Sequence, residues 1–191
     1  MIPIDEPWEK GYAFDIHTYE STFIGSNEFG HPMFYTKRSP MGQFLYELKY
    51  GQHLPVLEQI VELIVNDSSF HQFINSIDII LPVPPSNKYR KIQPVQVCSE
   101  KISEKFEKEL RSDILGSTNK DELKDVPTEE KYQKIKDAIT VDGKIKKAKR
   151  ILIFDDVYDS GSTLNAITTV LKGKGYLNIS IFTLTKTRKA D

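Results

Sequence analysis

The residues best suited to chemistry in this sequence are two adjacent carboxylates followed by a turn of small, hydroxyl-bearing residues. Asp155 and Asp156 come directly after the apolar run 151–154, and the hydroxyl-rich turn, DSGST, occupies residues 159–163. An apolar run of this kind is typical of a strand buried on both faces of a parallel sheet. The pattern therefore predicts carboxylates at the end of a central strand.

A helix is expected directly after this turn, because Leu164, Ile167 and Leu171 recur at helical spacing. The first N–H groups of a helix lack intrahelical partners, and with the helix dipole they favour an anion, usually a phosphate. Gly161 has no Cβ and allows a close backbone approach, while the neighbouring hydroxyls add donors. Carboxylates accept hydrogen bonds from sugar hydroxyls. Two acids beside an anion-binding turn therefore predict a site for a ribose 5-phosphate group.

Three other interpretations of the same stretch are weaker. A buried strand followed by a helix that Ser160 or Ser162 caps would explain the turn, but it leaves two successive acids unexplained. A Walker-type P-loop is excluded, because no Lys precedes Ser162 or Thr163 in the required G-K-[ST] order. A receiver domain carries its acidic pair near the start of the domain, whereas little chain follows the pair in this sequence.

The stretch ILIFDDVYDSGST, residues 151–163, resembles the phosphoribosyl pyrophosphate (PRPP) binding motif of type I phosphoribosyltransferases along its whole length. The resemblance implies that Asp155 and Asp156 hold the ribose hydroxyls. It implies that Tyr158 lies on the base side of the site and that Asp159 is a catalytic proton acceptor near the base. It also assigns the 5′-phosphate to the hydroxyl-rich turn, which consists of Asp159, Ser160, Gly161, Ser162 and Thr163.

A second stretch with suitable chemistry, the Pro loop PVPPSNKYRK at residues 82–91, follows the apolar run Ile77–Val83. Prolines restrict the loop backbone, and Lys88, Arg90 and Lys91 bring cations beyond the end of a strand, where open α/β sheets bind ligands. Such a loop suits a diphosphate. On the charges alone, a solvated basic loop is an equal alternative.

The Pro loop also resembles the pyrophosphate loop of the ComF-like, amidophosphoribosyltransferase-like branch of the family. In that branch the loop continues as Arg-Gly-Phe-Asn-Gln, whereas residues 90–94 of this chain read RKIQP. The segment FLYELKYGQH, residues 44–53, resembles the stretch before the first core strand of the same branch. The resemblance implies pyrophosphate contacts from Pro84, Pro85, Ser86, Lys88 and Arg90.

Hydrophobic spacing predicts the remaining elements. These are a β-hairpin over Tyr12–Thr36, helices over 40–51, from Pro55 onward and over 95–110, and strands at 77–83, 138–141 and 178–184. The segment 117–137 is poor in large apolar residues and is predicted to be a loop with partial helix. By position it resembles the catalytic hood of type I enzymes, and a plain surface loop is an equal alternative.

Composition narrows the class of protein. The formal net charge is −1 and 28% of residues are charged, which gives no support for binding nucleic acid or an anionic membrane. One Cys excludes an internal disulfide and a Cys-based zinc site. The start, MIPIDEPWEK, lacks the pattern of a signal peptide, and no apolar run reaches the length of a bilayer crossing. A cytoplasmic protein is therefore expected.

These patterns predict an α/β fold with a mainly parallel central sheet flanked by helices. Residues 1–40 are expected to form an N-terminal β-hairpin extension, and residues 41–191 a single compact phosphoribosyltransferase-like domain.

The resemblance implies an enzyme of nucleotide metabolism, a Mg²⁺-dependent phosphoribosyltransferase (a glycosyltransferase). It would transfer ribose 5-phosphate from PRPP to a nitrogen acceptor, in the first place a nucleobase, and release pyrophosphate. Mg²⁺ would be held mainly through PRPP, with Asp155 and Asp156 as further candidates. Two alternatives stay open: a non-catalytic sensor of PRPP or nucleotides, and a ComF-like accessory protein of DNA uptake. The expected partners are PRPP and a small-molecule acceptor, and a homodimer is left open.

Overall fold

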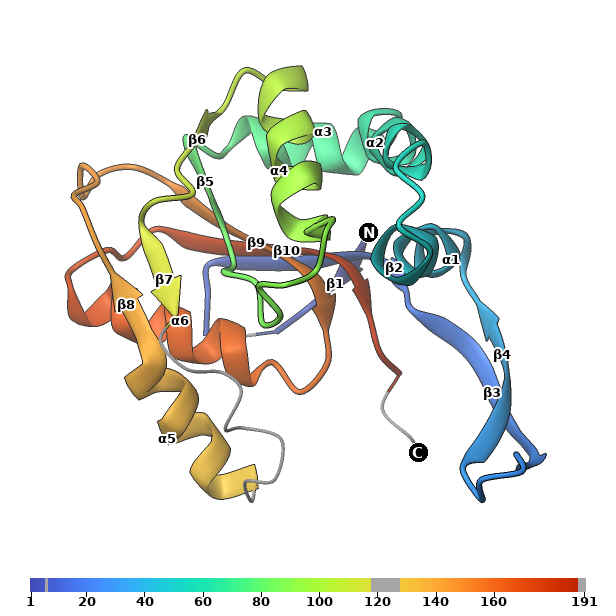
Figure 1. The fold of residues 1–191 in the computed structure, drawn as a ribbon. Coiled ribbons are helices and arrows are strands. Elements are labelled where there is room, and N and C mark those ends of the chain that lie inside the picture. Colours follow the sequence, from blue (N-terminus) through green and yellow to red (C-terminus); the bar gives the residue numbers. More distant parts are fainter. Residues whose placement is uncertain (6, 118–127, 189–191) are drawn as a thin grey trace.

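The computed structural model describes residues 1–5, 7–117 and 128–188, and for residues 128–131 it describes the backbone alone. Its centre is a mostly parallel sheet of six strands in the order β1-β2-β10-β9-β5-β6 (Figure 1). Strands β2, β10, β9, β5 and β6 run parallel, and β1 pairs antiparallel with β2 at one edge. The bounds are β1 Ile2–Pro3, β2 Lys10–Ile16, β10 Ile179–Lys186, β9 Ile151–Tyr158, β5 Ile79–Pro82 and β6 Glu109–Leu110.

Helices cover both faces of this sheet, which confirms the expected α/β class. The fully buried side chains of β9 alternate: Ile151 and Ile153 pack on one side, and Leu152 and Phe154 pack on the other. The first side holds α6 Ser162–Gly173 and α5 Thr128–Ala138; the second holds α1 Pro40–Tyr46, α2 Val56–Val65, α3 Ser68–Asn75 and α4 Pro94–Lys105 (Figure 1). A central strand buried on both faces explains the uninterrupted apolar run in the sequence.

Most expected helices are present. Ser39 caps α1 by accepting from Gly42 N, and Pro55 precedes α2. The structure shortens the helix expected over 95–110. Helix α4 ends at Lys105, because Glu107 adopts a left-handed conformation with φ 51°, and Leu110 belongs to β6. Helix α3 has no counterpart among the sequence predictions.

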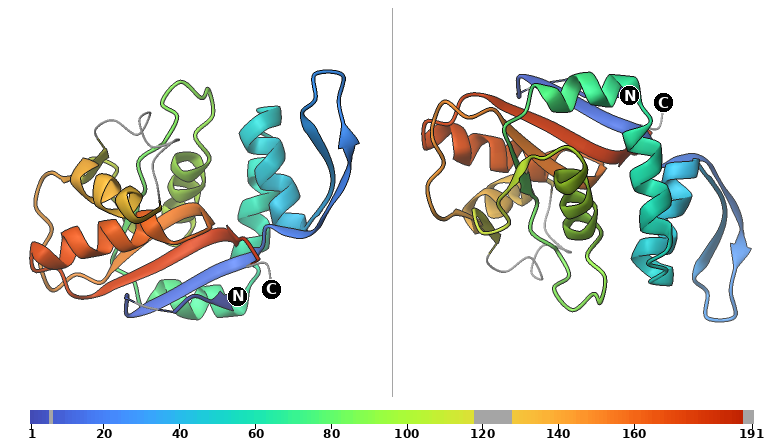
Figure 2. Two further views of the ribbon diagram at one scale, coloured as in Figure 1. Left: turned by 90° about the horizontal axis from the view of Figure 1, so that it is seen from below. Right: turned by 90° about the horizontal axis from the view of Figure 1, so that it is seen from above.

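The N-terminal β-hairpin is confirmed, with β3 at Thr18–Ser26 and β4 at Pro32–Arg38. It projects away from the central sheet beside α1 and α2 (Figure 2). Its range is narrower than expected, because Lys10–Ile16 pair with β10 inside the central sheet. Residues before position 40 therefore contribute to the main sheet, and the division of the chain at that position stays a prediction.

The segment expected at the position of a catalytic hood falls partly on residues 118–127, which lie outside the described residues. After them, α5 packs on α6, and Tyr132 Oη lies 3.1 Å from Thr169 Oγ1. The short strand expected near residue 138 is β8 Ile139–Val141, which pairs antiparallel with β7 Leu115–Ser117. No helix in the described part of the chain combines the length and the apolar character that a bilayer crossing requires.

Candidate functional site

The acid pair lies within β9, since the strand continues to Tyr158 and does not end at the last apolar residue. Asp155 lies opposite Thr183 of β10, and Val157 lies opposite Thr185. The sheet therefore fixes the backbone of both carboxylates, and the chain turns only afterwards. Asp156 N donates to Asp155 Oδ1 at 2.9 Å, which orients the first carboxylate of the pair.

Gly161 forms the junction between the hydroxyl-rich turn and α6. Its φ is 76°, a left-handed conformation that glycine adopts without steric cost. A Cβ at this position would lie 2.6 Å from Tyr158 Oη and 2.9 Å from ring carbons of Tyr158. Both the conformation and the available space therefore require glycine.

The first turn of α6 suits an anion. The N-cap residue Gly161 has no side chain, and Ser160 Oγ accepts a long hydrogen bond of 3.4 Å from Ser162 N. The helix dipole and the N–H groups that follow Ser162 in the first turn favour an anion at the hydroxyl-rich turn. The hydroxyls of Ser160 and Ser162 are hydrogen-bonded to each other at 2.9 Å, so one of the two O–H groups donates within the turn and the other can donate to a ligand. This is the arrangement that binds phosphate at helix starts.

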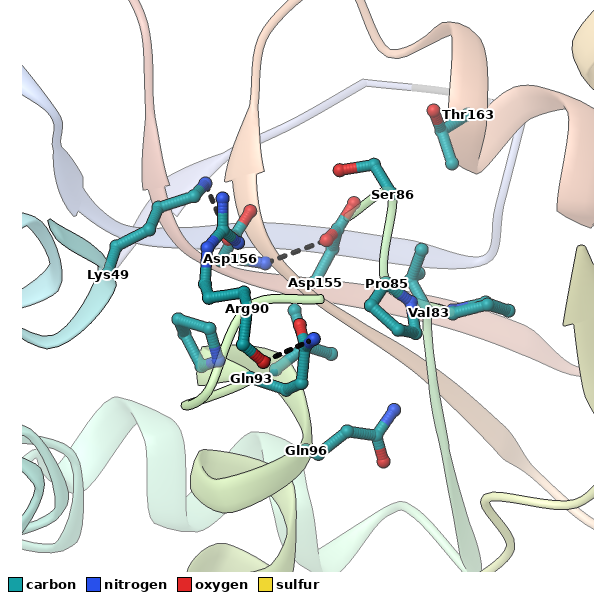
Figure 3. A pocket seen from close by; sticks show the side chains of 13 residues that line it. Lys49, Val83, Pro85, Ser86, Arg90, Gln93, Gln96, Asp155, Asp156 and Thr163 are labelled. Atoms are coloured by element: carbon teal, nitrogen blue, oxygen red, sulfur yellow. Dashed lines mark hydrogen bonds and ion pairs between the residues drawn. The ribbon is translucent and has the colours of Figure 1, made fainter. Parts of the chain in front are cut away.

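Two cavities meet at Asp155, the first residue of the acid pair. The first, of about 140 Å³, lies between the Pro loop and β9, and Figure 3 shows its side chains. The second, of about 180 Å³, follows the hydroxyl-rich turn and includes Ile135 of α5. Both are lined by Asp155 and Thr163. The structure thus brings together two segments that were selected separately in the sequence.

The predicted residues of the Pro loop separate into two groups. Pro84, Pro85, Ser86 and Arg90 line the first cavity, whereas Lys88 is exposed and is not among its lining residues. Two hydrogen bonds close the loop, because the amide of Gln93 donates to Asn87 O at 2.8 Å and to Arg90 O at 3.0 Å. The position of Arg90 makes it the better placed of the two expected cations.

Lys49 is a residue of the site that the sequence patterns did not indicate. Its Nζ lies 2.8 Å from Asp156 Oδ2, and its side chain lines the first cavity (Figure 3). The two residues are 107 positions apart. The only signal in the sequence was the position of Lys49 in the segment FLYELKYGQH, which resembles a family stretch but does not say what the lysine contacts.

A third cavity, of about 620 Å³, lies at the carboxyl ends of β2, β9 and β10. Asp159 lines it and accepts a hydrogen bond from Thr187 Oγ1 at 2.9 Å. Because Asp159 also lines the second cavity, this first residue of the hydroxyl-rich turn borders both cavities. The sequence patterns did not indicate the other polar residues here; the lining consists of Ile2, Ile16, Tyr158, Asp159, Lys186, Thr187 and Arg188.

Tyr158 forms one wall of the third cavity. Its ring packs edge-on against Trp8, with ring centroids 6.3 Å apart. Partial burial, together with the negative charge of Asp5, raises the pKa of the Tyr158 hydroxyl. The phenol therefore stays neutral and presents a flat apolar face with a polar tip.

The acid pair offers only part of a metal site. Among the described residues, no group of three or more His, Cys, Asp or Glu side chains is arranged to hold a metal ion. The acid pair supplies two carboxylates beside the first cavity. This donor set suits a Mg²⁺ ion that takes one or two protein carboxylates and completes its coordination with substrate phosphates and water.

Comparisons with known proteins add one finding. No model of a protein family matches the chain, and no curated protein matches it. Among solved structures, the chain is similar to a hypoxanthine phosphoribosyltransferase from Staphylococcus aureus, with 18% sequence identity and a TM-score of 0.43. The similarity covers 71% of this chain and 68% of that chain. A similarity of this extent does not define a family for the chain.

Proposed function

We propose that this protein is a Mg²⁺-dependent phosphoribosyltransferase that transfers ribose 5-phosphate from PRPP to a nitrogen acceptor, a nucleobase, and releases pyrophosphate. One observation carries the proposal: Asp155 and Thr163 line two cavities, one bordered by the hydroxyl-rich turn and the other by the Pro loop, and Asp156 lines the cavity beside the Pro loop. PRPP has the same order of groups, with a 5′-phosphate, a ribose and a diphosphate.

The geometry suggests a role for each part. A ribose bound at Asp155 and Asp156 would place its 5′-phosphate toward the hydroxyl-rich turn and its diphosphate toward Arg90. Guanidinium groups bind phosphate oxygens through parallel hydrogen bonds, so Arg90 would stabilise the leaving diphosphate. Phosphate contacts and carboxylate contacts would together fix the sugar between the acceptor and the leaving group.

In the transfer step, the bond between the ribose carbon C1 and the diphosphate oxygen breaks, and a bond from C1 to the acceptor nitrogen forms. The nitrogen must lose a proton, and Asp159 is the candidate base because it lines the third cavity. Tyr158 would pack against a flat acceptor there, and Lys186 would donate to an acceptor oxygen or nitrogen. Mg²⁺, when bound beside Asp155 and Asp156, would neutralise charge on the diphosphate.

Turnover is tested by pyrophosphate release from PRPP and Mg²⁺ in the presence of purine, pyrimidine and amine acceptors. We expect release that depends on the acceptor, and a loss of about 100-fold in the Asp159→Asn variant, since a positioned general base contributes at least this much. Tight PRPP binding without release across the panel would instead support a sensor. The continuation RKIQP after the Pro loop favours that second candidate.

The Pro loop makes a separate prediction about PRPP binding. We expect Arg90→Ala to weaken PRPP binding by about 10-fold, because hydrogen bonds to charged groups contribute about 1.5–3 kcal/mol. Ribose 5-phosphate, which lacks the diphosphate, should bind this variant nearly as well as the unaltered protein. Lys88→Ala is the matched control, because Lys88 is exposed outside the cavity. Equal losses in the two variants, measured by titration calorimetry, would contradict the assignment of Arg90.

A further inference from the structure

Lys49 and Asp156 form an ion pair inside the first cavity. The distance from Nζ to Oδ2 is 2.8 Å, and the two side chains are 20% and 15% exposed. Within the described part of the chain, the hydrogen bond to the Asp156 carboxylate is the one from Lys49 to Oδ2. Lys49 therefore fixes the carboxylate through one oxygen and leaves the other for a ligand in the cavity.

The backbone that carries Lys49 is unusual. Helix α1 gives way to a π-helical turn at Glu47–Gly51, and Gln52 follows with φ 50°. A π-helical turn holds an extra residue, which rotates the following side chains by about 100° relative to a regular α-helix. Such turns are rare and are frequent at functional sites. Here Leu48 is fully buried in the core, while Lys49 points toward Asp156 of β9.

The surroundings leave Lys49 as the cation on this carboxylate. His17 lies close by, with Nδ1 3.0 Å from Thr185 Oγ1. Burial, followed by the charges of Arg38 and Lys49, lowers the pKa of the His17 imidazole against the opposing charge of Asp156, so His17 is a weaker cation here than a free imidazole. Lys49 is therefore the cation that holds Asp156 Oδ2 in place.

We propose that Lys49 is a positioning residue for ribose recognition, which acts through Asp156 by holding Oδ2 so that Oδ1 meets a sugar hydroxyl. The inference rests on the proposed function, because it assigns the ribose to the acid pair. The alternative role for Lys49 is a direct contact with the diphosphate, because a lysine in this cavity could also bind phosphate oxygens.

The two roles are separated by titration calorimetry with three ligands: PRPP with Mg²⁺, ribose 5-phosphate, and pyrophosphate with Mg²⁺. We expect Lys49→Met to weaken PRPP and ribose 5-phosphate by the same factor of about 10 and to leave pyrophosphate unchanged. Lys49→Arg should restore both affinities to within about 3-fold. The double variant Lys49→Met with Asp156→Asn should bind no more weakly than Asp156→Asn alone.

Each other outcome contradicts the inference. A loss for PRPP and pyrophosphate, but not for ribose 5-phosphate, would make Lys49 a direct diphosphate contact. Additive losses in the double variant would show that Lys49 acts independently of Asp156. If Lys49→Met bound the three ligands as well as the unaltered protein does, the ion pair between Lys49 and Asp156 would have a structural role only. If the unaltered protein bound none of the ligands, the proposed function would fail as well.

Folding of the variants is followed separately. Lys101→Met is the matched control, because Lys101 forms an ion pair with Glu58 at 3.6 Å on the outer side of α2 and α4. If Lys49→Met does not fold, the double variant still decides the question. It removes both charges together and leaves no unpaired carboxylate, so its affinity is compared directly with that of Asp156→Asn.

Discussion

Replacement of both Asp155 and Asp156 by Asn is expected to weaken PRPP binding by about 10-fold or more, because each lost hydrogen bond to a charged group is worth about 1.5–3 kcal/mol. Both residues line the first cavity, and the sheet fixes their backbone, so a carboxamide would keep the shape and lose the charge. The measurement is calorimetric titration with PRPP and Mg²⁺.

The ligand series makes this test specific. Ribose 5-phosphate should lose a similar factor, whereas pyrophosphate titrated without Mg²⁺, which has neither the sugar nor the ion, should bind the double variant at least as well as the unaltered protein. Asp113→Asn is the control for a carboxylate away from the site, since Asp113 pairs with Arg111 on the surface. An unchanged PRPP affinity in the double variant would show that the ribose does not bind at the acid pair.

Gly161→Ala is expected to have the largest effect on stability. A left-handed conformation costs an L-residue roughly 1–2 kcal/mol, and the new Cβ would also lie 2.6 Å from Tyr158 Oη. Displacement of Tyr158 adds to the cost. We therefore expect the free energy of unfolding to fall by about 2 kcal/mol or more, because backbone strain alone costs an amount of this order. Urea denaturation measures this loss.

The same helix provides the control. Gly173 lies at the other end of α6, and a Cβ added there would meet no atom of another element within 4 Å, so Gly173→Ala should be neutral or mildly stabilising. Binding of ribose 5-phosphate should fall in Gly161→Ala and persist in Gly173→Ala, because only the first residue shapes the hydroxyl-rich turn. Equal stability of the two variants would contradict the account of Gly161.

The core of the fold could be predicted because its signals are local. The apolar runs of β5 and β9 and the helical spacing of α6 each lie within one segment, and the sheet order that joins them follows common rules for parallel strands. The membership of β2 could not be predicted in this way. Tyr12 to Thr18 form one alternating pattern, and alternation does not reveal whether a strand pairs with its neighbour in sequence or with β10.

The site was predicted less completely than the core of the fold. Asp155 and Asp156 lie inside β9 and not beyond its end, and the first cavity brings them together with Arg90, while the roles of all these residues stay predictions. Lys49 was missed because the direction of its side chain depends on a π-helical turn, and no periodic pattern of residues in the sequence indicates such a turn. Lys186 and Thr187 were missed because residues at a strand end acquire their neighbours only from the assembled sheet.

The parallel pairing of β2 with β10 has a consequence for synthesis on the ribosome. His17, directly after β2, lies 3.0 Å from Thr185 of β10 through its Nδ1, across 168 residues of chain. At about 5–20 residues per second, the intervening chain takes roughly 10–30 s to emerge. During this interval β2 has only the two-residue strand β1 at one edge, and the edge that pairs with β10 stays open. The hairpin and α1 to α3 can already form from local contacts. The nascent chain therefore exposes an unpaired strand edge for most of its synthesis, and chaperones that bind extended apolar segments would find Lys10–Ile16 available.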